Sequence, residues 1–199
     1  MARLVVSEFL TLDGVMQAPG DRNEDRSGGF EQGGWQLAYF DDAFGRFVME
    51  GFAASGAFLF GRVTYQNFAA FWPKQPADDP VAGPMNSTPK YVVSTTLDDP
   101  LEWQNSTLIR DDVAATIRRL KAQDGKDIQV IGSGELVQTL IHEGLVDEYR
   151  LMVHPVVLGE GKRLFREGTG LSRLILVESS ATSKGVLLLT YVPAEGDPA

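Results

Sequence analysis

The segment Val130-Ile131-Gly132-Ser133-Gly134-Glu135-Leu136 carries the strongest structural signal in the chain, because a strand runs through a turn of small residues into a helix. Gly132 and Gly134 let the backbone take unusual torsions and approach a ligand closely. The amides at the new helix start have no intrahelical partner, and the helix dipole favours an anion there. Pyrophosphate fits such a turn, and a tight turn that merely requires glycine is an equally good interpretation. The full G-x-G-x-x-G pattern is absent, so this is not a standard Rossmann turn.

A second turn of the same kind is Phe60-Gly61-Arg62-Val63-Thr64-Tyr65, which again follows a strand and opens a helix. Arg62 and Thr64 lie in the first helical turn, where a guanidinium and a hydroxyl beside free amides form an anion site. Taken alone, this turn is better explained as a surface arginine on a capped helix. Two such turns in one chain favour a dinucleotide, because that ligand needs several phosphate contacts.

Outward from these turns, strand-like and helix-like runs alternate, which is typical of an α/β domain. We predict strands at 3–10, 57–60, 91–93, 106–109, 127–131 and 147–153, and helices at 41–54, 63–72, 111–123 and 135–143. Two further β runs at 174–178 and 186–192 predict a terminal antiparallel pair. The stretches 13–34 and 73–89 are predicted loops. We expect one domain over residues 1–193 and a frayed tail at 194–199.

The composition limits the classes of partner. The chain has 199 residues and a net charge of −9, with no basic run, which argues against nucleic acid. It contains no cysteine, which excludes disulfides and thiolate metal sites and fits a reducing cytoplasm. His142 and His154 lack metal-binding spacing, so we expect no metal site. Neither a signal peptide nor a membrane span is recognisable, and we expect a cytoplasmic protein.

Three other segments are candidates for ligand contacts. Ser94-Thr95-Thr96 follows a strand, so its hydroxyls fit a ribose or a ribose phosphate, although such residues more often cap a turn. Leu12-Asp13-Gly14-Val15-Met16 is either a lid over a nicotinamide or an ordinary surface turn. His154-Pro155-Val156-Val157-Leu158-Gly159-Glu160-Gly161 leads into Lys162-Arg163, which brings local positive charge to an acidic chain. A tight connection with solvated charges is the default interpretation of that segment.

These turns, in this order, resemble the dihydrofolate reductase superfamily. The sequence is most similar to the reductase domain of bifunctional riboflavin-biosynthesis deaminase–reductases and to its stand-alone bacterial relatives. The resemblance covers nearly the whole chain and is most specific in the 154–161 segment. It implies a three-layer α/β sandwich with a mostly parallel sheet and a C-terminal antiparallel hairpin. It also implies NADPH as the cofactor, and a homodimer.

The resemblance further implies a set of site residues. Those expected to bind the cofactor are Gly61, Arg62, Thr64, Ser94 and Thr95 at the adenosine phosphates and Gly132, Ser133, Gly134, Glu135 and Leu136 at the pyrophosphate. Those expected at the lid and the substrate are Asp13, Gly14, Met16, Gly159 and Gly161. A proton comes from water or from an acid such as Asp42.

The sequence therefore predicts an NADPH-dependent reductase that transfers a hydride to a small heterocyclic substrate, pterin-like or pyrimidine-like. The alternative is a non-catalytic nucleotide-binding module that kept the fold. A dimeric structural domain without a ligand is a third possibility. Titration with NADPH, followed by a substrate screen, separates the three.

Overall fold

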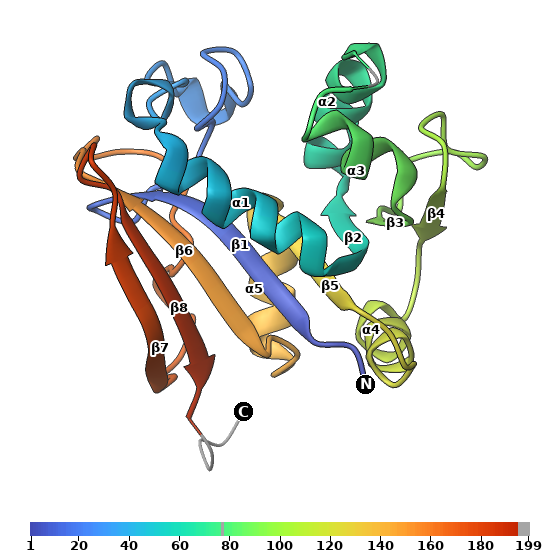
Figure 1. Cartoon of the computed structure of the whole chain (residues 1–199). Helices are drawn as coiled ribbons and strands as arrows, with labels where there is room; N and C mark the ends of the chain where they lie inside the picture. Colours follow the sequence, from blue (N-terminus) through green and yellow to red (C-terminus); the bar gives the residue numbers. More distant parts are fainter. Residues whose placement is uncertain (77, 195–199) are drawn as a thin grey trace.

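The computed structural model describes residues 1–76 and 78–194, so residues 195–199 of the expected frayed tail lie outside the described part (Figure 1). Its strands are β1 (Leu4–Thr11), β2 (Ser55–Gly61), β3 (Lys90–Val93), β4 (Ser106–Ile109), β5 (Asp127–Ile131), β6 (Glu148–His154), β7 (Leu174–Ala181) and β8 (Leu187–Pro193). Its α-helices are α1 (Asp42–Ala54), α2 (Arg62–Phe71), α3 (Ala82–Ser87), α4 (Val113–Lys121) and α5 (Gly134–His142). Short 3-10 helices lie at η1 (Ser27–Gly29), η2 (Leu37–Tyr39) and η3 (Trp72–Lys74). Within this part of the chain, no helix is both long and apolar enough to cross a bilayer.

The strands form one sheet in the order β4-β3-β2-β5-β1-β6-β8-β7. The neighbours from β4 to β6 pair in parallel, whereas β8 pairs antiparallel with both β6 and β7. The mostly parallel sheet and its C-terminal hairpin are therefore confirmed. Because parallel neighbours need crossover connections, the helices between them cover both faces of the sheet.

The short apolar run in β2 explains how the two helical layers are held. Phe58 and Phe60 belong to a buried cluster with residues of α1, α2 and α3. Leu59, between them, belongs to a second cluster with residues of α4 and α5. Successive residues of a strand point to opposite faces, so a strand buried on both faces is apolar throughout. In Figure 1, α1 crosses one face of the sheet and α5 lies behind it.

Two local predictions were wrong. The stretch 73–89 was expected to be a loop but contains α3, because Asp79 Oδ1 accepts hydrogen bonds from the amides of Val81 and Ala82, and because Met85 is buried. Asp111 was expected to cap the fourth helix. The N-cap is instead Asp112, which is left-handed with φ 46° and makes no side-chain capping bond.

The topology places the two glycine-containing turns side by side. Strand β2 pairs with β5, and α2 and α5 begin where these strands end. The two helices pack on opposite faces, since Tyr65 of α2 and Val137 of α5 belong to different core clusters. Their first turns therefore meet over the carboxyl edge of the sheet, where ligands bind in open α/β sheets.

Candidate active site

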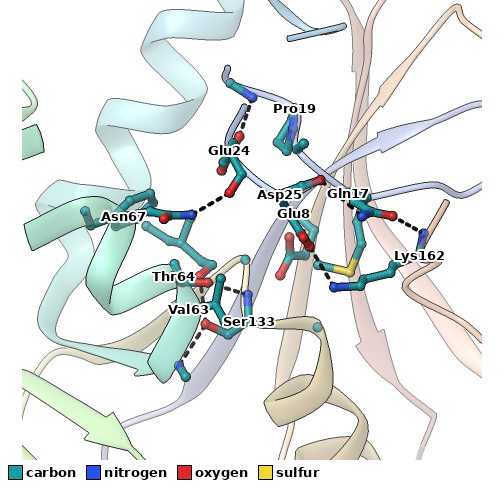
Figure 2. Close-up of a pocket in the computed structure, with 18 of the residues that line it drawn as sticks. Glu8, Gln17, Pro19, Glu24, Asp25, Val63, Thr64, Asn67, Ser133 and Lys162 are labelled. Atoms are coloured by element: carbon teal, nitrogen blue, oxygen red, sulfur yellow. Dashed lines mark hydrogen bonds and ion pairs between the residues drawn. The ribbon is translucent and has the colours of Figure 1, made fainter. Parts of the chain in front are cut away.

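A cavity of about 910 Å³ lies at this carboxyl edge. Such a volume is near the upper end of small-molecule sites, which span about 300–1,000 Å³. It is lined by the start of α2, by the turn 131–136, and by the loop that follows β1 (Figure 2). Predicted site residues among its lining are Gly61, Arg62, Thr64, Met16, Gly132, Ser133, Gly134, Glu135 and Leu136.

The two helix starts are joined by side-chain hydrogen bonds. The Ser133 amide donates to Thr64 Oγ1 at 3.0 Å, and the Gly61 amide donates to Ser133 Oγ at 2.9 Å (Figure 2). Each turn thus positions the other although their sequences lie about seventy residues apart, as the 69- and 72-residue separations of these pairs show. The convergence expected from the sequence is present, and two of the amides are already used to hold it.

The helices at the cavity lack side-chain caps, in contrast to α1. The α1 start is closed by Asp41, whose carboxylate accepts from the Phe44 amide at 2.9 Å. The N-caps of α2 and α5 are Gly61 and Ser133, and neither makes a side-chain capping bond. First-turn amides without an intrahelical partner or a cap are available to an anionic ligand. The two uncapped starts therefore form an anion-binding surface inside the cavity.

The glycines of the 131–136 turn let neighbouring side chains approach the backbone closely. Gly132 has φ +60°, and a Cβ there would lie 3.1 Å from Thr64 Oγ1. A Cβ on Gly134 would lie 2.9 Å from Met16 Sδ. Side chains at these positions would collide with Thr64 and Met16, which already lie against the turn. Val93 and Val113 add apolar lining near the start of α4, which is also uncapped. The cavity therefore combines uncapped helix starts, whose amides suit an anion, with an apolar wall, and these residues fit a dinucleotide.

The loop after β1 closes the cavity on the opposite side. Asn67 of α2 donates to the Glu24 carbonyl at 2.9 Å, and Lys162 Nζ contacts Asp25 Oδ2 at 2.7 Å (Figure 2). Gln17 holds the same loop, since its Oε1 accepts from the Lys162 amide at 3.0 Å. Although burial opposes it, the hydrogen bonds from Lys162 and Ser27 lower the pKa of Asp25. The loop is thus fixed to α2 and to the 154–165 segment.

Two carboxyls with little exposure to solvent face the cavity, the buried Glu8 and the half-buried Glu24. Glu8 of β1 is 4% exposed, and its burial raises its pKa well above the usual range. The Gly132 amide opposes this shift, and repulsion from Glu24 adds to it. Burial also raises the pKa of Glu24, although its carboxylate accepts from the amides of Gly20 and Asp21. A neutral carboxyl at Glu8 is able to donate a hydrogen bond to a ligand.

Ser94 and Thr95 do not line the cavity. The Ser94 hydroxyl accepts from the amides of Thr96 and Leu97, both at 3.1 Å, and so closes the turn after β3. Thr95 is exposed. The turn-capping interpretation of this segment matches the observed contacts, because the Ser94 hydroxyl accepts from local backbone amides and does not face the cavity.

Four of the five residues assigned to the lid and the substrate also lie elsewhere. The Asp13 carboxylate accepts from the amides of Leu158 and Gly159, at 3.2 and 2.9 Å, and thereby joins the two loops at their base. Gly14 and Gly159 have positive φ and open space around them. Gly161 lines a separate, smaller depression. Of that set, only Met16 lines the main cavity.

Asp42 is exposed in the first turn of α1 and does not line the cavity. Its neighbour Asp41 makes the contacts of this region. Besides capping α1, the Asp41 carboxylate accepts from the Ser183 hydroxyl at 2.6 Å and from the Ser183 amide at 2.8 Å. The Phe44 amide and the Ser183 hydroxyl lower the pKa of Asp41 to about 2. Asp41 caps the start of α1, and Asp42 lies in its first turn. The structure does not bring Asp42 to the site.

Sequence reasoning missed Glu8, Glu24 and Arg166, which all line the cavity. Glu8 had a usable signal, because it interrupts the face of β1 on which Leu4, Val6 and Leu10 enter the core. Arg166 contacts Glu135 of α5 at 2.9 Å but follows β6 in an irregular segment. No periodic pattern marks a residue in such a segment, so only the tertiary structure could identify it.

Comparison with known proteins identifies the family of this chain. The model of the RibD C-terminal domain family matches residues 2–188. The chain belongs to the RibD C-terminal domain family. Two Bacillus subtilis (strain 168) relatives are uncharacterized. YyaP is 37% identical over 139 residues, or 67% of this chain and 71% of YyaP, and YwjB is 30% identical over 130 residues, or 65% of this chain and 70% of YwjB.

Solved structures share the fold of this RibD-type domain. A putative riboflavin biosynthesis protein from Shewanella sp. PV-4 aligns with a TM-score of 0.72 and 22% identity, covering 98% of this chain and 100% of that one. A pyrimidine reductase-like protein from Corynebacterium diphtheriae aligns with a TM-score of 0.66 and 12% identity, covering 98% and 92%. The dihydrofolate reductase-like architecture expected from the sequence is thus confirmed, and family membership supports a reductase role.

Proposed function

We propose that this RibD-type domain is an NADPH-dependent reductase of a small heterocyclic substrate, pterin-like or pyrimidine-like. The proposal depends on one observation. Two uncapped helix starts, α2 and α5, are hydrogen-bonded to each other and open into the same cavity of about 910 Å³. Paired anion-binding surfaces at one site suit a ligand with two linked phosphates.

In this proposal some residues bind the phosphates of the cofactor and others surround the reacting ring. The α2 and α5 amides and the Arg62 guanidinium hold phosphate oxygens. Arg62 lines the cavity, and within the described part of the chain its guanidinium donates only to the exposed Gln66, at 3.0 Å. It is therefore free to turn toward a ligand. The loop bearing Met16 covers the cavity and excludes water.

The bound nicotinamide would supply the hydride, and the protein's task is to position the two rings and to stabilise developing charge. The carboxyl ends of β1 and β5 form the floor on which that positioning depends, because Ser7, Glu8 and Ile131 line the cavity there. Backbone pairing of Ser7 with Ile131 fixes this floor. Rigid strands position reacting groups more accurately than loops.

The deciding experiment measures NADPH binding by calorimetry in the wild-type protein and in Gly134→Leu. A leucine side chain there would collide with Met16 and crowd the start of α5, so we expect at least about a tenfold loss of affinity, the equivalent of one hydrogen bond to a charged group. Gly125→Leu is the matched control, because a Cβ at Gly125 meets nothing within 4 Å. Equal affinities in both variants would contradict the proposed site.

A substrate screen then tests catalysis. NADPH consumption is followed with pterins, pyrimidines and quinones as acceptors. Turnover with a pterin or a pyrimidine would support the reductase assignment. Tight NADPH binding without turnover on any acceptor would instead indicate a nucleotide-binding module that retains the fold.

A further inference from the structure

Glu8 is an unusual residue for its position. It lies on β1 between Val6 and Leu10, which are both in the hydrophobic core. Its side chain is 4% exposed and lines the cavity. Within the described chain its Oε1 has no hydrogen-bond partner. Buried polar atoms are almost always paired, so an unpaired one that faces a ligand cavity points to a partner supplied by the ligand.

The charges around Glu8 indicate what kind of ligand this is. The loop side of the cavity carries Asp21, Glu24 and Asp25. The cation there is Lys162, and Asp25 already neutralises it at 2.7 Å. A phosphate group at this end would meet carboxylates without an unpaired cation among the described lining residues. Desolvating such an arrangement is unfavourable.

The remaining cations belong to the other end of the cavity. Arg62 lies in the first turn of α2, and Arg166 contacts Glu135 at the start of α5 at 2.9 Å. The approach of Arg166 to the Gly134 position, 4.0 Å from an ideal Cβ, places its guanidinium beside the turn assigned to the pyrophosphate. The unpaired Arg62 and the uncapped helix starts thus lie at one end, where Glu135 neutralises Arg166, whereas three carboxyls and one neutralised lysine lie at the other. In Figure 2, Glu8 lies between Ser133 of the α5 turn and Lys162.

We infer that the end of the cavity between β1 and the loop 16–25 binds an uncharged nitrogen heterocycle without a phosphate group, held by a hydrogen bond to the Glu8 carboxyl. This inference rests on the proposed function, which assigns the helix starts to the cofactor. It specifies the substrate class, because it excludes phosphorylated substrates. Glu8 is the specificity-determining residue: its protonated carboxyl donates to a ring nitrogen or carbonyl, and its second oxygen accepts from a ring N–H.

The test compares matched probes that differ only in a phosphate. They are 6-hydroxymethylpterin and its phosphate ester, and uridine and uridine 5′-monophosphate. Binding is measured by ligand-observed NMR on protein saturated with NADP⁺, so that the phosphate-binding end is occupied. We expect at least one uncharged ring to bind and its phosphate ester to bind at least about tenfold more weakly, the effect of one desolvated, uncompensated charge contact.

Substitutions of Glu8 separate recognition from folding. In Glu8→Leu the affinity of the bound ring should fall by about tenfold or more, since one hydrogen bond to a buried group is lost. Glu8→Gln keeps the size and the polar character and should retain part of the binding. Thermal unfolding of both variants checks that the cavity is folded. If Glu8→Leu fails to fold, the comparison with Glu8→Gln across a series of rings with and without N–H groups decides the issue.

A second measurement is independent of turnover. The Glu8 carboxyl is titrated by side-chain NMR with and without the ring, in the presence of the neighbouring Glu24, Asp25–Lys162 and Glu135–Arg166 groups. Binding of the ring should change the Glu8 signal. Tighter binding of a phosphate ester than of its parent ring, no binding of either ring, or unchanged affinity in Glu8→Leu would each overturn the inference.

The two proposals fail in different ways. Absence of NADP⁺ binding would reject the proposed function. The same probes measured without NADP⁺ would still report on Glu8, because its carboxyl belongs to β1 and not to either helix start.

Discussion

At the residue scale, Thr64 and Ser133 determine how the two helix starts meet. Thr64 is in the first turn of α2, and its hydroxyl accepts the Ser133 amide at 3.0 Å. Ser133 has φ 63°, a left-handed conformation that costs a non-glycine residue free energy. Its own hydroxyl accepts a hydrogen bond from the Gly61 amide. The reciprocal contacts therefore stabilise a strained backbone at the point where a ligand would bind, as is common at functional sites.

Replacing Thr64 with valine should weaken both the fold and cofactor binding. The Ser133 amide would lose its acceptor in a partly buried position, which costs about 1–3 kcal/mol. Thr64→Ser retains the hydroxyl and should be close to the wild type. Chemical denaturation and NADPH calorimetry on both variants provide the comparison, and equal stabilities would mean that this contact is not important.

Replacing Arg62 with alanine should weaken NADPH far more than NADH. The guanidinium is exposed and lines the cavity, so it is positioned for the additional phosphate of NADPH. One charge-assisted hydrogen bond contributes about 1.5–3 kcal/mol, or roughly a 10- to 100-fold change in Kd. Calorimetry with both nucleotides measures the ratio, and an equal loss for both would refute the role in NADPH preference.

At the scale of elements, the loop after β1 and the segment after β6 are folded against each other. Asp13 accepts from the amides of Leu158 and Gly159 at the base of this pair. Further along, Val15 forms a β-bridge with Arg163, and the Met16 amide donates to the Lys162 carbonyl at 2.8 Å. The loop that lines the cavity is therefore held by the segment after β6, whose conformation depends on Gly159 and Gly161.

Gly161 and Gly159 offer a matched test of that packing. Gly161 has φ +113°, and a Cβ there would lie 2.7 Å from Val15 Cγ1 and 2.9 Å from the Phe30 ring. Gly161→Ala should lower the free energy of unfolding by about 2–5 kcal/mol, from backbone strain and overpacking together. Gly159 has φ +79° and open space, so Gly159→Ala should cost only about 1–2 kcal/mol. Denaturant titration of the two variants checks the order; the reverse order would contradict this account.

At the scale of the whole molecule, carboxylates that join distant segments should govern acid stability. The Thr11 hydroxyl and, against a small opposing effect of burial, the amides of Gly159 and Leu158 lower the pKa of Asp13 to about 2. Asp41 is shifted in the same direction by Phe44 and Ser183. A depressed pKa in the folded state stabilises the protein above the unfolded-state pKa of about 3.9. That stabilisation is lost as the pH falls toward 2.

Asp13→Asn should therefore be less stable than the wild type at neutral pH, and the difference should shrink between about pH 4 and pH 2. Thermal unfolding of the two proteins over this range measures the convergence. A stability difference that stays constant with pH would show that the Asp13 charge has no part in it. Asp41 remains in both proteins, so both should still lose stability in acid.

The outer edge of the sheet is the second feature at this scale. Strand β7 lies at one edge of the sheet. Three of its apolar residues, Ile175, Leu176 and Val177, are 53%, 48% and 61% exposed. An unprotected edge with apolar side chains favours pairing with another chain. We expect a homodimer whose association is weakened by Val177→Lys and not by Ser180→Lys on the same strand. Sedimentation velocity distinguishes these outcomes, and a monomeric wild type would refute the expectation.

Local patterns were sufficient for most of the elements and for the two glycine-containing turns at the helix starts. Alternating apolar runs located β5 and β4 at their observed bounds, and glycines after β2 and β5 marked the helix starts, because both signals arise between neighbours in the chain. The prediction of a loop at 73–89 was wrong because the helical periodicity of that stretch is weak. Helix α3 is instead stabilised by hydrogen bonds to Asp79 and by burial of Met85.

Long-range contacts determined the rest. Strand order brought Thr64 to Ser133 and placed Glu8, Glu24 and Arg166 around one cavity. It left Ser94 and Asp13 in structural contacts outside the cavity and Asp42 exposed to solvent. The environment of a carboxyl is set by residues that are distant in sequence. Burial at Glu8 raises its pKa, and hydrogen bonds at Asp13 lower its pKa, although the two lie five positions apart. Side-chain identity is a property of the chain, whereas desolvation and hydrogen bonding exist only once the chain has folded.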